Sequence, residues 1–97
     1  MSLPKFLQPY LASYDLSRLD KNSPAVAKEI ITEVLNKGDE KAVNWVFGNY
    51  TLAQIREVVS NPQRGVWFEE SLNYWSKMLK IGEIKNQSEA ILNINPT

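Results

Sequence analysis

Apolar residues recur at three- and four-residue spacings along most of this chain, and capping or turn residues separate the segments that show the pattern. The clearest helix is predicted for residues 24–37. Ser23 is placed to cap it, Pro24 suits its first position, and Gly38 follows its last turn. One face of this helix is apolar, with Val26, Ile30 and Val34 flanked by Ala27, Ile31 and Leu35.

The same spacing predicts three further helices, over residues 39–48, 51–60 and 67–81. Thr51 and Gln54 have the spacing of a capping box at the start of the second of these helices. Trp45 and Trp75 fall on the apolar faces of the first and the third, and we expect both rings at the centre of the core.

These segments predict an all-α fold, a compact orthogonal bundle of four to five short helices, in a single domain over residues 3–82. Within it, residues 3–20 are expected to form one or two helical turns folded over the core. Residues 83–97 are predicted as a C-terminal tail that is at most partly ordered. This tail either forms one more turn capped by Ser88 or serves as a partner-binding segment.

The composition, with 43% hydrophobic and 23% charged residues, is that of an ordinary globular protein. No apolar run approaches the roughly 18–20 residues that a membrane span needs. The N-terminus also lacks the apolar stretch of a secretory signal. We therefore expect a cytoplasmic protein.

The chain has no His and no Cys, which excludes thiol chemistry and the usual imidazole and thiolate metal sites. Adjacent acids occur as Asp39-Glu40 and Glu69-Glu70, but each pair lies early in a predicted helix, where negative charge suits the dipole. The four glycines fall at predicted helix ends or turns and form no phosphate-binding loop. We therefore expect a protein that is not an enzyme and has no cofactor or metal. An enzyme acting through carboxylates or Tyr is the least favoured hypothesis.

The aromatic residues are the main candidates for function. Trp67 and Phe68 are adjacent at a predicted helix start, where both rings cannot easily turn inward, and Arg64 lies close by. Because aromatic and Arg side chains are enriched at the energetic centres of interfaces, all three are candidate partner-binding residues. The alternative interpretation is that the two rings form a hydrophobic staple at the start of the helix and bind no partner. Two further candidate surfaces are the N-terminal segment with Tyr10 and Tyr14 and the apolar strip Ile91–Ile94.

The helices predicted over residues 39–48 and 51–60 also suggest a helix-turn-helix, and hence a DNA-binding autoregulator. Its candidate nucleic-acid-binding residues are Gln54, Arg56 and Arg64. Lys and Arg total 11 and Asp and Glu also total 11, so the net charge is zero, whereas phosphate binding normally requires a basic surface. DNA binding is therefore the second hypothesis, behind protein interaction.

Several short motifs occur together, each once, over residues 3–82. They are Pro9-Tyr10, Tyr14-Asp15-Leu16-Ser17, Ile30-Ile31, Val34-Leu35-Asn36, Gly38-Asp39, Ile55-Arg56-Glu57-Val58, Asn61-Pro62-Gln63-Arg64-Gly65 and Leu72-Asn73-Tyr74-Trp75. With these motifs the chain resembles a family of small prokaryotic all-helical proteins of uncharacterised function, often encoded beside nucleotidyltransferase toxins of the abortive-infection class. The resemblance implies an antitoxin-like or accessory role, with a nucleotidyltransferase toxin as the protein partner, and it implies no catalytic residue.

Overall fold

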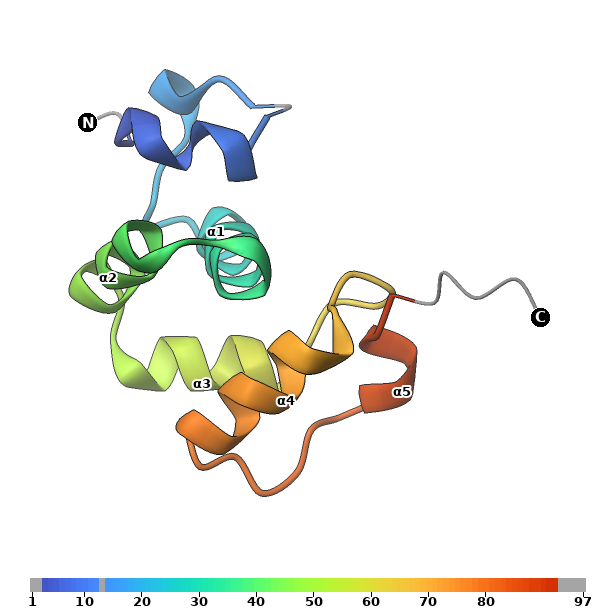
Figure 1. Cartoon of the computed structure of the whole chain (residues 1–97). Helices are drawn as coiled ribbons and strands as arrows, with labels where there is room; N and C mark the ends of the chain where they lie inside the picture. The colour runs from blue at the N-terminus through green and yellow to red at the C-terminus, as the bar shows by residue number, and fades with distance from the viewer. Residues whose placement is uncertain (1–2, 13, 93–97) are drawn as a thin grey trace.

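The computed structural model describes residues 3–12 and 14–92, and it shows an all-α bundle (Figure 1). The predicted fold class is therefore confirmed. The elements, in chain order, are the 3-10 helices η1 (Lys5–Tyr10) and η2 (Leu16–Arg18) and the α-helices α1 (Pro24–Lys37), α2 (Glu40–Asn49), α3 (Leu52–Ser60), α4 (Glu69–Met78) and α5 (Gln87–Ala90). None of the described helices is both long and apolar enough to cross a lipid bilayer.

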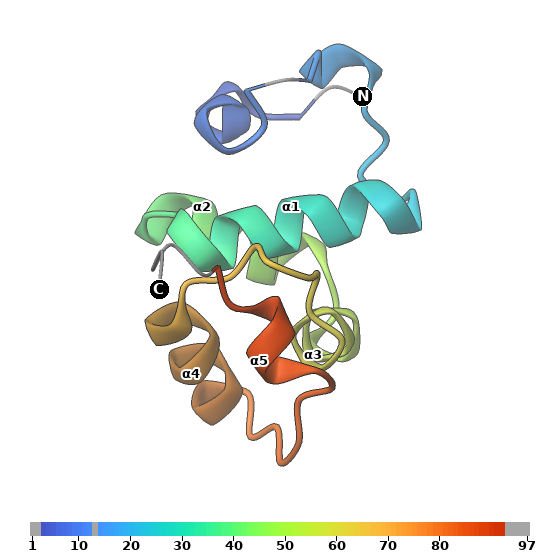
Figure 2. The same ribbon diagram turned by 90° about the vertical axis from the view of Figure 1, so that its right-hand side faces the viewer.

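Helix α1 is the central element of the bundle and contacts η1, α2, α3 and α4. The N-terminal segment lies on one side of α1, and α3, α4 and α5 lie on the other (Figure 2). Helix α1 is seen end-on in Figure 1, where α3 is seen from the side, and the reverse holds in Figure 2, so the two cross steeply. Because α1 is covered on both sides, it buries polar residues as well as apolar ones: Ala27, Ile30, Ile31, Thr32, Val34, Leu35 and Asn36.

Local capping fixes two of the helix starts where the sequence predicts them. The side chain of Asp39 accepts a hydrogen bond from the backbone N–H of Ala42 at 2.9 Å and caps α2. Thr51 and Gln54 form a complete capping box at the start of α3. Each motif satisfies backbone N–H groups that a helix end leaves without an intrahelical partner.

The helix predicted over residues 67–81 is shorter in the structure. Trp67 is extended and forms an isolated parallel bridge with Ile91, so α4 begins only at Glu69. At the other end, the N–H of Lys80 donates to the Lys77 carbonyl at 3.1 Å, and the N–H of Ile81 donates to the Ser76 carbonyl at 2.8 Å. This is the Schellman pattern, and Lys80 takes its left-handed position with φ 55. The helix therefore ends before Gly82 and without a glycine.

The prediction that Trp45 and Trp75 lie at the centre of the core is also wrong. Trp45 and Trp75 are half-buried and pack against the core from its edge, whereas Trp67 is 0% exposed and is the largest fully buried side chain. The indole N–H of Trp75 donates to the carbonyl of Leu35, near the end of α1, at 2.8 Å. The expected apolar faces of α3 and α4 are likewise incomplete, since Leu52 is 55% and Met78 is 59% exposed.

Residues 83–92 pack against the rest of the bundle. The N–H of Lys85 donates to the carbonyl of Ser60 at 3.0 Å, and Ala90 is fully buried. Helix α5 follows Asn86, so Ser88 lies inside it and does not cap it. The core therefore does not end at Gly82.

Candidate protein-binding surface

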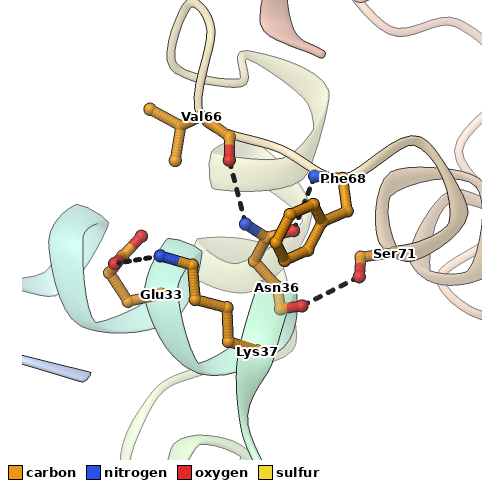
Figure 3. A network of polar contacts seen from close by, with 6 residues as sticks. All are labelled: Glu33, Asn36, Lys37, Val66, Phe68 and Ser71. Carbon is orange, nitrogen blue, oxygen red and sulfur yellow. Dashed lines mark hydrogen bonds and ion pairs between the residues drawn. The ribbon is translucent and has the colours of Figure 1, made fainter. Parts of the chain in front are cut away.

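The side-chain amide of Asn36 holds residues 66–68 in place (Figure 3). Its Nδ2 donates to the carbonyl of Val66 at 2.9 Å, and its Oδ1 accepts the N–H of Phe68 at 2.8 Å. The side chain of Ser71 donates to the Asn36 carbonyl at 2.9 Å. Asn36 is 5% exposed, so these bonds have little competition from water. They fix the backbone from which the Phe68 ring projects.

A second set of hydrogen bonds joins the same segment to residues after α5. The N–H of Gly65 donates to the carbonyl of Glu89 at 2.7 Å, the N–H of Trp67 to that of Ala90 at 2.9 Å, and the N–H of Leu92 to that of Trp67 at 2.6 Å. Residues 65–67 and 90–92 thus run side by side as a minimal parallel pairing. The structure thereby brings together two candidate regions that are far apart in the sequence, the Arg64–Phe68 segment and the start of the strip at Ile91. Ile94 lies outside the described residues.

This pairing explains which aromatic side chain faces solvent. Successive side chains of an extended segment point to opposite faces. Trp67 and its bridge partner Ile91 face the core, so Phe68 and Leu92 face outward and are 41% and 40% exposed. Arg64 is exposed in the turn that leads into the segment with Phe68. We call Arg64, Phe68 and Leu92 the Phe68 corner.

Trp67 does not belong to the Phe68 corner. Its side chain is wholly buried, so it offers no surface to a partner in this fold. The sequence correctly indicates that Trp67 and Phe68 cannot both turn inward, but it does not say which one does. The indole N–H of Trp67 has no hydrogen-bond partner among the described residues.

A second apolar surface lies on α2 and α4, and sequence analysis missed it. The ring of Trp75 packs against Phe47 with 5.7 Å between centroids and against Tyr74 with 4.9 Å. Phe47 is 40%, Tyr74 54% and Met78 59% exposed. Since these side chains sit on helices whose apolar spacing favours burial, only the positions of neighbouring elements reveal that they are uncovered.

The N-terminal candidates lie across α1 from the Phe68 corner (Figure 2). Tyr10 uses its hydroxyl to accept the backbone N–H of Asp39 at 3.2 Å, which ties the segment to the start of α2. Tyr14 is 43% exposed beside a cavity of about 130 Å³. The two tyrosines and the Phe68 corner therefore do not form one site.

Tyr50 fastens the other end of the N-terminal segment. Its hydroxyl donates to the carbonyl of Lys21 at 3.0 Å, and its ring meets Trp45 edge-to-face at 5.9 Å between centroids. Burial, assisted by the negative charge of Asp20, raises the pKa of Tyr50 to about 12. An open cleft of about 470 Å³ lies between this segment and α2, with Arg18, Lys21 and Trp45 among its lining residues.

The residues of the DNA-binding hypothesis lie on or after α3, and two of them have structural roles. The side-chain carbonyl of Gln54 accepts the N–H of Thr51 at 2.8 Å in the capping box. The guanidinium of Arg56 lies 3.5 Å from the carbonyl of Lys80, the longest side-chain hydrogen bond in the described part of the chain. Arg64 lies in the turn after α3, so of the three residues only Gln54 and Arg56 are on the helix itself.

The acidic pairs lie where capping predicts them. Asp39 precedes α2 and Glu40 opens it, while Glu69 and Glu70 lie in the first turn of α4. Within residues 3–12 and 14–92, no group of three or more Asp or Glu side chains is placed to hold a metal ion. No known protein family, curated protein or solved structure matches this chain.

Proposed function

We propose that this chain is a non-enzymatic protein-interaction module that binds a protein partner through the Phe68 corner. The observation that carries the proposal is an exposed aromatic side chain on a backbone fixed by a buried amide: Phe68 is 41% exposed while its N–H is held by Asn36 at 2.8 Å. A side chain held in place before binding loses little conformational freedom on association, which favours affinity.

The chemistry of the corner is that of an interface centre. Aromatic and Arg residues are enriched among the residues that contribute most to binding, and here an aromatic ring, an aliphatic side chain and a guanidinium lie on adjoining segments. Phe68 and Leu92 supply apolar area, and Arg64 supplies a charged donor for a carboxylate or carbonyl of the partner.

The resemblance described above favours a nucleotidyltransferase toxin as that partner, and therefore an antitoxin-like role in a prokaryotic cytoplasm. A neutral chain without His or Cys fits a protein that acts by binding and not by chemistry. The DNA-binding hypothesis remains the alternative, and the same experiment tests both.

The test uses the tagged full chain as bait in lysate of its native host, with bound protein identified by mass spectrometry. Bound nucleic acid is read from the ratio of absorbance at 260 and 280 nm. We expect a stoichiometric nucleotidyltransferase with the wild-type chain and its loss with the Phe68→Ala/Leu92→Ala double variant. The matched control is Leu52→Ala, which truncates an apolar side chain that is 55% exposed on α3.

Recovery of nucleic acid without a protein would favour the DNA-binding hypothesis instead. Equal recovery of the toxin by the double variant and the wild type would discard the Phe68 corner as its binding surface.

A further inference from the structure

Helix α4 presents a face that is complementary to itself. Glu70, Tyr74, Lys77 and Met78 are all exposed. Glu70 lies four residues before Tyr74, and Lys77 and Met78 lie three and four residues after it, so all four are on one side of the helix. Glu70 lies in the first turn and Lys77 in the last turn, so the face is acidic at one end, basic at the other and aromatic between them.

From this arrangement we infer that α4 binds α4 of a second copy of this chain, antiparallel, across a two-fold axis near Tyr74. In an antiparallel helix pair, positions equally far before and after the axis face each other. An axis beside Tyr74 places Glu70 of each copy opposite Met78 of the other, one residue from Lys77, so that the Glu70 carboxylate lies within reach of the Lys77 ammonium. The two Tyr74 rings then meet at the centre.

Charge complementarity selects a second copy as the occupant. A two-fold contact requires that the same patch match itself after rotation, and here an acid meets a base twice while the aromatic centre meets itself. The antiparallel arrangement also sets the positive end of each helix dipole beside the negative end of the other. Among the described residues, neither Glu70 nor Lys77 takes part in an ion pair, so both charges are available.

Apolar area extends the contact beyond the charges. Tyr74 is 54% and Met78 59% exposed, and Phe47, 40% exposed, adjoins them through its packing on Trp75. The helix is ten residues long and so spans only about 15 Å. The contact is accordingly small, and we expect a dimer that dissociates on dilution. The inference is independent of the proposed partner, because it uses neither Phe68 nor Leu92.

The test is sedimentation equilibrium of the full chain from about 1 μM to about 1 mM, a range that brackets the dissociation constants of weak protein contacts. We expect a reversible monomer–dimer equilibrium. Glu70→Lys alone and Lys77→Glu alone should each raise the dissociation constant by about tenfold or more, because each creates two like-charge contacts across the axis. Lys5→Glu, a charge reversal in the N-terminal segment on the far side of α1, should leave it unchanged.

The decisive arm mixes the two single variants. A Glu70→Lys chain and a Lys77→Glu chain are mismatched with themselves but matched with each other, so the mixture should recover the dimer as a heterodimer. A wild-type chain that stays monomeric up to about 1 mM, or a mixture that associates no better than its components, would overturn the inference. Circular dichroism of each variant checks that the helices are intact.

Discussion

Phe68 donates its backbone N–H to the side chain of Asn36 at 2.8 Å, across 32 residues of sequence. This one bond joins the buried end of the central helix to the exposed aromatic corner. The same amide also binds the carbonyl of Val66 at 2.9 Å, so Asn36 pairs with residues 66 and 68 as a neighbouring strand would.

The first prediction concerns Asn36. Asn36→Ala leaves the part-buried N–H of Phe68 and carbonyl of Val66 without their side-chain partner, and we expect it to lower the free energy of unfolding by about 2–3 kcal/mol. Ser71→Ala removes a single hydrogen bond to the Asn36 carbonyl, at 2.9 Å, and should cost about 1 kcal/mol. Urea denaturation followed by tryptophan fluorescence measures both, and equal costs for the two variants would contradict this account.

The second prediction concerns the left-handed residue after α4. Lys80 has φ 55, a conformation that strains residues with a Cβ and that glycine adopts freely. We expect Lys80→Gly to raise the free energy of unfolding by about 1 kcal/mol. Lys77→Gly, three residues earlier and inside the helix, should lower it by about 1 kcal/mol. Thermal unfolding of the two variants should therefore shift in opposite directions.

A third prediction contrasts two glycines. A Cβ on Gly38 would collide with the carbonyl oxygen of Val34, which accepts the Gly38 N–H at 2.6 Å, so Gly38→Ala should destabilise the protein by about 1–3 kcal/mol. Gly48 lies within α2, and a Cβ there would meet nothing within 4 Å. Gly48→Ala should therefore stabilise the protein by about 0.5 kcal/mol. Denaturation midpoints of the two variants are compared. A Gly38→Ala variant more stable than the wild type would contradict the collision with the Val34 carbonyl.

The fourth prediction concerns alkaline pH. The pKa of Tyr50 is raised to about 12 in the folded protein, whereas an unfolded tyrosine ionises near pH 10. Between these values the unfolded state binds fewer protons than the folded one, so stability falls as pH rises. The stabilising effect of Tyr50 is complete below pH ~10 and should be lost by pH ~12, with a magnitude of about 1–2 kcal/mol.

Tyr50→Phe is the control for this effect. It removes the hydrogen bond to the Lys21 carbonyl and should cost about 1 kcal/mol at neutral pH. The difference in unfolding free energy between wild type and variant should then shrink above pH ~10. Spectrophotometric titration at 295 nm should show a tyrosine that ionises near pH 12 in the wild type and is missing from the Tyr50→Phe variant. Identical titration curves above pH ~11 for the wild type and the variant would contradict the raised pKa of Tyr50.

Much of the fold could be predicted because it depends on residues close in sequence. The caps at Asp39 and Thr51 satisfy backbone groups within three residues of themselves, and Glu69 and Glu70 place negative charge in the first turn of α4, where it suits the helix dipole. The ion pair between Glu33 and Lys37, at 3.2 Å, is likewise the product of one helical turn. Such signals place helices without knowledge of their neighbours.

The predictions are wrong where contacts between segments far apart in the sequence determine the structure. Trp67 follows a helical spacing in the sequence, yet it is extended because the backbone of Ala90 and Leu92 offers it hydrogen bonds. Trp45 and Trp75 have the spacing of core residues, but the helices around them leave one edge of each uncovered. The sequence singles out Arg64, Phe68 and the Ile91–Ile94 strip as separate candidates, whereas only the backbone pairing shows that Phe68 and Leu92 lie on neighbouring segments.

The backbone pairing at Trp67 also bears on how this protein is made. A ribosome releases residues in order, so the backbone of Trp67 remains without its hydrogen-bond partners until residues 90–92 have followed it out. Up to that moment the nascent bundle carries an unpaired backbone edge beside Trp67, a feature that invites aggregation and chaperone binding. The pairing at Trp67 thus waits for residues 90–92, and a chain that stalls near Gly82 presents an incomplete bundle to cellular quality control.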